Sequence, residues 1–180
     1  MTLFRNKYRI ESARKPHWDY TLPGSYFVTI CTHEKKPYFG GVANATVNLS
    51  AIGEYADACW KEVPKHHQHI DIDDSVVMPN HMHGIVIIGG PDRLPEMRKR
   101  EKFKRVAELN EVRPKASSLG AVVGSFKSVV TQWCEAKQVE FEWQPRFHDR
   151  IIRGKNSLKA VWEYIRNNPG NWCKDTFYVA

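Results

Sequence analysis

Residues 76–88, with the sequence VVMPNHMHGIVII, constrain the fold of this chain more than any other stretch. Pro79 and Asn80 give a turn signal between two apolar runs rich in β-branched residues, which predicts a β-hairpin. Successive side chains of a strand point to opposite faces, so His81 and His83 share one face. Such a pair either holds one metal ion or consists of surface histidines beside a turn, and the motif alone leaves both interpretations open.

Three further segments have the composition of strands. Each is rich in β-branched or aromatic residues, and they span 25–32, 70–77 and 141–152. The segment at 70–77 is expected to pair with 81–88 across the turn at Pro79 and Asn80. Gly40 and Gly41 mark a loop before the first helix.

Three segments repeat apolar residues at helical spacing and are predicted to be helices. They span 51–63, 119–137 and 158–168, with Ser50, Ser118 and Ser157 as their N-caps. Pro64 is expected to stop the first helix. Pro169 is expected to end the third, because the residue before a proline is pushed out of the α region. In the second helix, Val129 is expected on the buried stripe.

This order of strands and helices predicts an α+β fold, with a central antiparallel sheet and helices packed on it. The 180 residues fit a single domain, which we place at 24–175. A basic N-terminal arm at 1–23 precedes the domain, a basic insertion at about 91–118 interrupts it, and a tail at 176–180 follows. Basic residues make up six of the eight positions at 98–105, which makes the insertion a candidate for contacts with phosphates.

The composition favours an anionic partner such as nucleic acid, because the formal net charge is +7 and the pI is about 9.3. The four cysteines are widely spaced, so neither a zinc ribbon nor a dithiol redox motif is expected. The N-terminus lacks the apolar core of a signal peptide, and no apolar run approaches the roughly 20 residues that span a bilayer. The expected location is therefore cytoplasmic, without membrane contact.

Tyr164 and Asn168 stand one helical turn apart in the last predicted helix. They therefore share one flank at the edge of the apolar stripe. Taken singly, the tyrosine fits a core-edge aromatic residue and the asparagine fits a C-terminal cap, and helical spacing does not exclude either interpretation.

Five motifs in order resemble the REP-associated tyrosine transposases, which are relatives of the single-tyrosine insertion-sequence transposases in the HUH endonuclease superfamily. The resemblance runs from about residue 17 to 175. It rests on PGSYFVTICT at 23–32, VVMPNHMHGI at 76–85, SFKS at 125–128, WQ at 143–144 with IIR at 151–153, and EYIRNNP at 163–169.

The resemblance implies a ferredoxin-like (RRM-like) HUH fold and assigns roles to four residues. His81 and His83 would be metal ligands, Asn168 the third protein ligand and Tyr164 the nucleophile. The implied reaction joins Tyr164 to a 5′-phosphate of single-stranded DNA and frees a 3′-hydroxyl. Attack by another 3′-hydroxyl on the phosphotyrosine can reverse this reaction and rejoin strands. The implied cofactor is a divalent metal, Mg²⁺ or Mn²⁺. No nucleotide cofactor is expected, because the covalent bond stores the energy of the phosphodiester, and the absence of a phosphate-binding Gly-x-x-x-x-Gly-Lys loop fits this.

The implied partner is single-stranded DNA with a palindromic hairpin. Candidates for backbone contact or base stacking are Arg14, Lys15, Trp18, Lys127, Trp143, Arg146, His148, Arg150, Arg153 and Lys155. The chain departs from many relatives at 147–150, where it has Phe-His-Asp-Arg in place of Tyr-Tyr-Glu-His. This difference affects the local DNA contacts and the role of His148.

Two other functions remain alternatives at this point. A domesticated, non-catalytic hairpin-DNA-binding protein would keep the fold, although the intact quartet of site residues favours an enzyme. A two-histidine phosphoesterase acting on RNA would need two His-x-Thr/Ser motifs, and the chain has none. A monomer or a homodimer is expected, and the short loop from Arg153 to Ser157 favours a tyrosine that acts within its own chain.

Overall fold

A four-stranded antiparallel sheet forms the centre of the molecule in the computed structural model, which describes residues 18–67, 69–89 and 118–179. Its strands, in the order β4-β5-β1-β6 across the sheet, are Ile70–Met78, His81–Ile88, Gly24–Cys31 and His148–Ile152. A separate two-stranded hairpin consists of β2 (Gly40–Ala43) and β3 (Thr46–Leu49).

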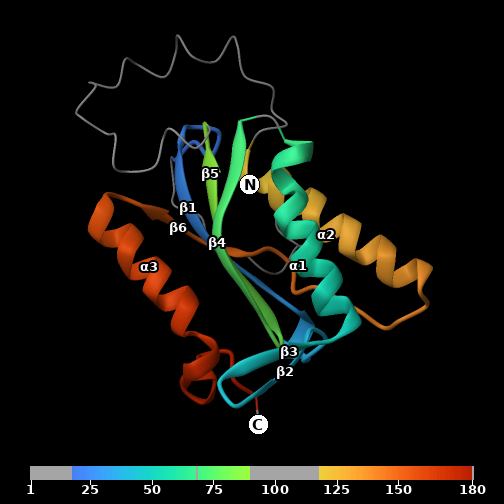
Figure 1. The fold of residues 1–180 in the computed structure, drawn as a ribbon. Coiled ribbons are helices and arrows are strands. Elements are labelled where there is room, and N and C mark those ends of the chain that lie inside the picture. The colour runs from blue at the N-terminus through green and yellow to red at the C-terminus, as the bar shows by residue number, and fades with distance from the viewer. Residues whose placement is uncertain (1–17, 68, 90–117, 180) are drawn as a thin grey trace, which may run out of the picture.

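Helices cover both faces of the sheet (Figure 1). On one side lie α1 (Ala51–His66) and α2 (Leu119–Ala136), and on the other lies α3 (Lys155–Asn167). The succession β1-α1-β4-β5-α2-β6, with this strand order, is the split βαβ arrangement of ferredoxin-like folds. The predicted α+β fold is confirmed, and α3 is the addition that covers the second face.

Strand β5 separates two hydrophobic cores because its side chains alternate between the faces of the sheet. Met82 and Val86 belong to the core beneath α1 and α2, whereas Ile85 belongs to the smaller core beneath α3. His81 and His83 have the same parity as Ile85. The hairpin therefore places both imidazoles on the face that α3 covers.

The two serine caps predicted for α1 and α2 are confirmed. The Ser50 side chain accepts a hydrogen bond from the Gly53 amide, and Ser118 accepts one from the Ala121 amide. The prediction that Pro64 stops the first helix is wrong, because α1 continues to His66. A proline removes one N–H donor but has a helical φ, so the last turn accommodates it.

The third helix begins earlier than predicted. Gly154, with a φ of 92°, is its N-cap and Lys155 its first residue, so the assignment of Ser157 as the cap is wrong. The helix ends at Asn167, close to the expected end, but Asn168 keeps helical angles (φ −58°, ψ −45°) despite the following proline. The chain then continues into the 3₁₀ helix η6 (Pro169–Lys174).

Three smaller predictions are also corrected. The Gly40-Gly41 segment is part of β2 and not a loop. The strand predicted at 141–152 is regular only from His148, since Trp143 forms a single bridge with Thr32. Val129 is 42% exposed and so lies outside the buried stripe of α2.

Replacing Gly84 with alanine is expected to destabilise the protein by about 1–3 kcal/mol, because a Cβ there would meet the buried Trp60 indole at 2.8 Å. Gly124→Ala is the matched control, because a Cβ added there meets nothing within 4 Å among the described residues beyond its own helix, and alanine favours the helix. Urea unfolding measures both free energies. An unchanged midpoint for Gly84→Ala would contradict the close packing of Trp60 on β5.

Candidate metal and nucleophile site

The two histidines of the hairpin are buried, with 0% of His81 and 1% of His83 exposed. The interpretation of a surface pair beside a turn is therefore wrong. Their Nε2 atoms lie 3.1 Å apart, close enough for both to be ligands of one cation.

Hydrogen bonds fix the orientation of both rings. The Asn80 amide nitrogen donates to the carbonyls of Lys35 and Phe177, which leaves its oxygen to accept from Nδ1–H of His81 at 2.9 Å. His81 therefore presents the Nε2 lone pair to its partner.

The Nδ1 atom of His83 is hydrogen-bonded to a hydroxyl, whereas that of His81 is bonded to an amide oxygen. Its Nδ1 lies 2.9 Å from Oγ1 of Thr29, and a hydroxyl both donates and accepts. His83 Nε2–H can donate to His81 while Nδ1 accepts from Thr29. In the other tautomer Nδ1–H donates to Thr29, and both Nε2 lone pairs are then available to a cation.

The histidines are neutral at physiological pH. Burial lowers the pKa of each imidazole to about 3, and the charge of Lys35 acts in the same direction on the pKa of His81. Metal ligation requires neutral imidazole. No proton has to leave the pair before it binds a cation.

This depressed pKa predicts acid sensitivity of the metal-free protein. Because the folded-state pKa lies near 3 and the unfolded value near 6.5, the unfolded chain binds more protons between these values. Stability is expected to fall as the pH drops below about 6.5, by up to about 1.4 kcal/mol per pH unit for each histidine. Urea unfolding with a chelator at pH 7, 6 and 5 measures this slope. A His81→Ala, His83→Ala double variant as steep as the wild type would contradict it.

Tyr164 of α3 reaches the histidine pair. Its hydroxyl lies 3.2 Å from Nε2 of His83, and its ring packs edge-on against Phe27. The residue is 44% exposed, so the hydroxyl stands at the border between the buried histidines and solvent. Burial raises the pKa of this phenol, which keeps it protonated at neutral pH.

The helix that carries Tyr164 is bound to the sheet of its own chain. Trp162 donates to Asp73 at 2.7 Å, and Arg166 pairs with Asp74 at 2.6 Å. Both aspartates lie on β4 where its register shifts against β5 between residues 72 and 75. These contacts hold the tyrosine over the histidines of the same chain.

Asn168 is buried, with 3% exposed, and is not a simple C-terminal cap. Its amide nitrogen donates to the Asp175 carboxylate at 2.8 Å. Its amide oxygen is buried and has no hydrogen-bond partner among the described residues. A buried carbonyl oxygen of this kind suits a cation, so the residue fits a ligand role.

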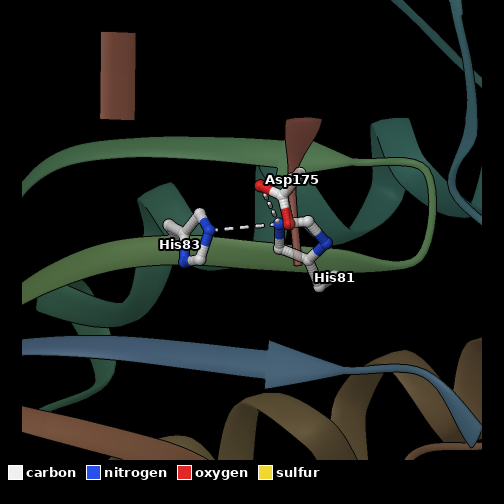
Figure 2. A group of neighbouring side chains, drawn as sticks. All are labelled: His81, His83 and Asp175. Atoms are coloured by element: carbon white, nitrogen blue, oxygen red, sulfur yellow. Dashed lines mark hydrogen bonds and ion pairs between the residues drawn. The ribbon is translucent and has the colours of Figure 1, made fainter. Parts of the chain in front are cut away.

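A carboxylate that the sequence patterns missed completes this group. The ligand atoms of Asp175, His81 and His83 all lie within 4.8 Å of one another (Figure 2). Tyr164, Asn168 and Asp175 also line one pocket of about 380 Å³ between α3 and the segment after it. No periodicity or spacing in the sequence identifies Asp175, since it follows the last helix in an irregular segment.

Several of the predicted DNA-contact residues make contacts within the protein, and among them Arg153 lies over the Trp18 ring. Trp18 packs against the larger core and donates to the Tyr26 hydroxyl at 3.3 Å. Lys127 donates to two backbone carbonyls at 144 and 146, and the Trp143 indole donates to the carbonyl of Lys127. Burial lowers the pKa of Lys127 to about 8. Their contact with DNA stays a prediction.

The other DNA-contact candidates of the described chain are solvent-exposed: Arg146, His148, Arg150, Arg153 and Lys155. Thr29 on β1 is the register partner of His83 on β5 and of His148 on β6. His148 therefore lies in line with the histidine pair at the edge of the sheet. Arg14, Lys15 and the insertion at 91–118, apart from residue 118, lie outside the described residues.

Two observations concern the whole described chain. All four cysteines are free, and Cys31 and Cys134 are buried. Among the described residues, no helix is long and apolar enough to cross a membrane.

Comparison with known proteins shows relatives in sequence and in fold. An uncharacterised protein of Haemophilus influenzae is 33% identical over 171 residues, which cover 93% of this chain and 92% of that protein. No protein-family model matches the sequence.

Among solved structures, the REP-associated tyrosine transposase bound to a REP hairpin superposes with a TM-score of 0.56. The identity is 18%, over 88% of this chain and 74% of that one. A candidate transposase of Deinococcus radiodurans superposes less well, with a TM-score of 0.39 at 10% identity over 86% of this chain and 97% of that one. Only the first likeness is close enough to show a shared fold.

Proposed function

We propose that this chain, which has the fold of the REP-associated tyrosine transposase and belongs to one family with the Haemophilus influenzae protein, nicks and rejoins single-stranded DNA at hairpins. The enzyme class is a tyrosine transposase of the HUH type, with Tyr164 as the nucleophile. The observation that carries the proposal is the placement of the Tyr164 hydroxyl 3.2 Å from Nε2 of His83, beside a second buried imidazole.

The donor set fits a divalent cation, which we take to be Mg²⁺ or Mn²⁺. Two neutral imidazoles and the orphaned oxygen of Asn168 would hold it. When bound, such an ion polarises a phosphodiester oxygen and stabilises the negative charge that develops in the transition state.

The chain's own contribution is to position the nucleophile. The Tyr164 oxygen attacks the phosphorus of the bound strand, an O–P bond to tyrosine forms, and the bond to the 3′-oxygen breaks. The phenol loses one proton in this step, and the departing 3′-oxygen gains one to become the 3′-hydroxyl. Reversal by another 3′-hydroxyl joins strands and needs no nucleotide cofactor, because the phosphotyrosine bond keeps the energy of the phosphodiester.

The exposed edge of the sheet suggests where the single-stranded DNA lies. His148 and Arg150 alternate with half-buried residues on β6, so they share the face on which α3 and the histidines lie. We propose that this edge, with Arg146, Arg153 and Lys155, binds the DNA backbone. Tyr164 contacts the histidines of its own chain, which supports a tyrosine that acts within that chain, in a monomer or in a homodimer.

The test is an incubation of the purified protein with single-stranded hairpins that flank its gene, with and without Mn²⁺, read on a denaturing gel. The proposal predicts a protein–DNA adduct and a shortened strand, both only with the cation. Binding of the hairpin without any cleavage in Mg²⁺ or Mn²⁺ would favour the non-catalytic hairpin-binding protein.

A further inference from the structure

The segment after η6 brings a carboxylate to the histidine pair. Oδ2 of Asp175 lies 3.9 Å from Nε2 of His81, and the Asp175 side chain is 2% exposed. Figure 2 shows the Asp175 carboxylate beside the His81 ring, whose other neighbour is His83. Among the described residues, the one ion-pair partner of this carboxylate is His81, and a buried carboxylate is costly unless it is paired or binds a metal.

A second observation also indicates a cation at this point. Asn168, which donates to Asp175 through its amide nitrogen, has a buried amide oxygen with no partner among the described residues. An unsatisfied buried acceptor costs about 1–3 kcal/mol. A cation near the carboxylate would satisfy this oxygen and balance the charge of Asp175 together.

The backbone around Asp175 is anchored in a way that fixes the carboxylate. Its second oxygen accepts from the Phe177 amide at 2.7 Å, and the Phe177 carbonyl accepts from the Asn80 side chain at 2.8 Å. Lys35 donates to the Thr176 carbonyl at 3.0 Å, and the Phe177 ring packs 4.6 Å from the His81 ring. Asn80 therefore orients both His81 and the segment that carries Asp175.

We propose that Asp175 is a fourth protein ligand of the divalent cation, beside His81, His83 and Asn168. This inference rests on the proposed function for the identity of the cation, and it assigns to the C-terminal segment a part in the site. A carboxylate lowers the net charge of the bound site from +2 to +1, and it adds the hard oxygen donor that Mg²⁺ and Mn²⁺ prefer.

A purely structural role is the competing explanation, since Asp175 also accepts hydrogen bonds from Asn168 and Phe177. The two roles differ in their effect on metal affinity. Removing a ligand weakens binding directly, whereas loosening a hydrogen-bonded segment lowers the melting temperature first.

The test is a titration of the full-length, metal-free protein with Mn²⁺, followed by calorimetry or by the electron paramagnetic resonance signal of the free ion. For Asp175→Asn, which keeps the size of the side chain, we expect binding to weaken by more than about 100-fold, beyond the 10- to 100-fold loss that is typical of residues that only orient ligands. Glu163→Gln is the matched control. It removes the same charge from the lining of the same pocket, but its side chain is 61% exposed and pairs with Lys159. We expect its affinity to stay within twofold of the wild type.

Melting temperatures of the same proteins, with and without Mn²⁺, separate a loss of metal binding from a loss of stability. The rise in melting temperature on adding Mn²⁺ reports metal binding even for a destabilised variant. We expect this rise to shrink for Asp175→Asn and to be partly retained for Asp175→Glu, which keeps a carboxylate. Wild-type Mn²⁺ affinity in Asp175→Asn, or an equal loss in Glu163→Gln, would overturn the proposal.

The outcome is independent of the proposed reaction. A wild-type protein that binds Mn²⁺ through Asp175 but forms no DNA adduct would refute the nicking function and leave this ligand assignment intact. A wild-type protein that forms the adduct while Asp175→Asn binds Mn²⁺ normally would do the reverse.

Discussion

Tyr164→Phe is expected to abolish the covalent protein–DNA adduct, by on the order of 10³-fold or more, while hairpin binding persists. The substitution removes only the hydroxyl oxygen, which is the atom placed 3.2 Å from His83. The ring keeps its edge-on contact with Phe27, so the packing of α3 on the sheet should not change. The adduct is measured on a denaturing gel with a labelled hairpin and Mn²⁺, and binding is measured by mobility shift.

Tyr178→Phe is the control for this change. Tyr178 is also exposed (40%) and lies three residues after Asp175, but its ring contacts Trp172 and not the histidine pair. Its variant should form the adduct at the wild-type rate. An adduct that persists in Tyr164→Phe and disappears in Tyr178→Phe would move the nucleophile to the C-terminal segment.

Replacement of either His81 or His83 by alanine should reduce metal-dependent cleavage by about 10²-fold or more, and Mn²⁺ affinity with it. Each ring supplies an Nε2 atom to the space between them, and the described chain offers no third histidine there. Cleavage rates at increasing Mn²⁺ concentration separate weaker binding from a slower reaction. Excess Mn²⁺ should rescue the variants in part if the loss is one of affinity.

His66→Ala provides the matched control. His66 is exposed at the end of α1, on the opposite side of the sheet from α3. Its loss should change neither cleavage nor Mn²⁺ affinity. Because the site histidines are buried, circular dichroism and melting curves must first show that their variants fold. Folded variants with unchanged cleavage would remove both histidines as ligands.

The sequence was sufficient to predict the parts of the site that regular structure controls. Alternation along a strand placed His81 and His83 on one face, and one helical turn placed Tyr164 and Asn168 on one flank. The structure brings these two pairs together, since Tyr164 meets His83 and Asn168 lies in the same pocket as Tyr164. Periodicity fixes the direction in which each side chain points from its helix or strand. The fold then brings these helices and strands together.

The sequence did not reveal two residues of the site, a hydroxyl within strand β1 and a carboxylate in an irregular segment. Thr29 appeared as one more β-branched residue of a strand, although its hydroxyl is hydrogen-bonded to Nδ1 of His83. Asp175 follows a 3₁₀ helix, and its position depends on long-range contacts with Lys35 and Asn80. Periodic patterns carry no information about such contacts. The wrong helix boundaries at Pro64 and Ser157 show that local signals fix the ends of a helix less well than its interior.

The most direct test of the central claim is to locate the bond between protein and DNA. The wild-type protein is incubated with a single-stranded hairpin and Mn²⁺, the covalent product is digested with trypsin and nuclease, and its peptides are analysed by mass spectrometry. Cleavage after Lys159 and Arg166 yields AVWEYIR, in which Tyr164 is the one tyrosine. We predict that the nucleotide mass is found on this peptide, at Tyr164. A nucleotide on any other peptide, or cleaved DNA with no modified peptide at all, would contradict the account.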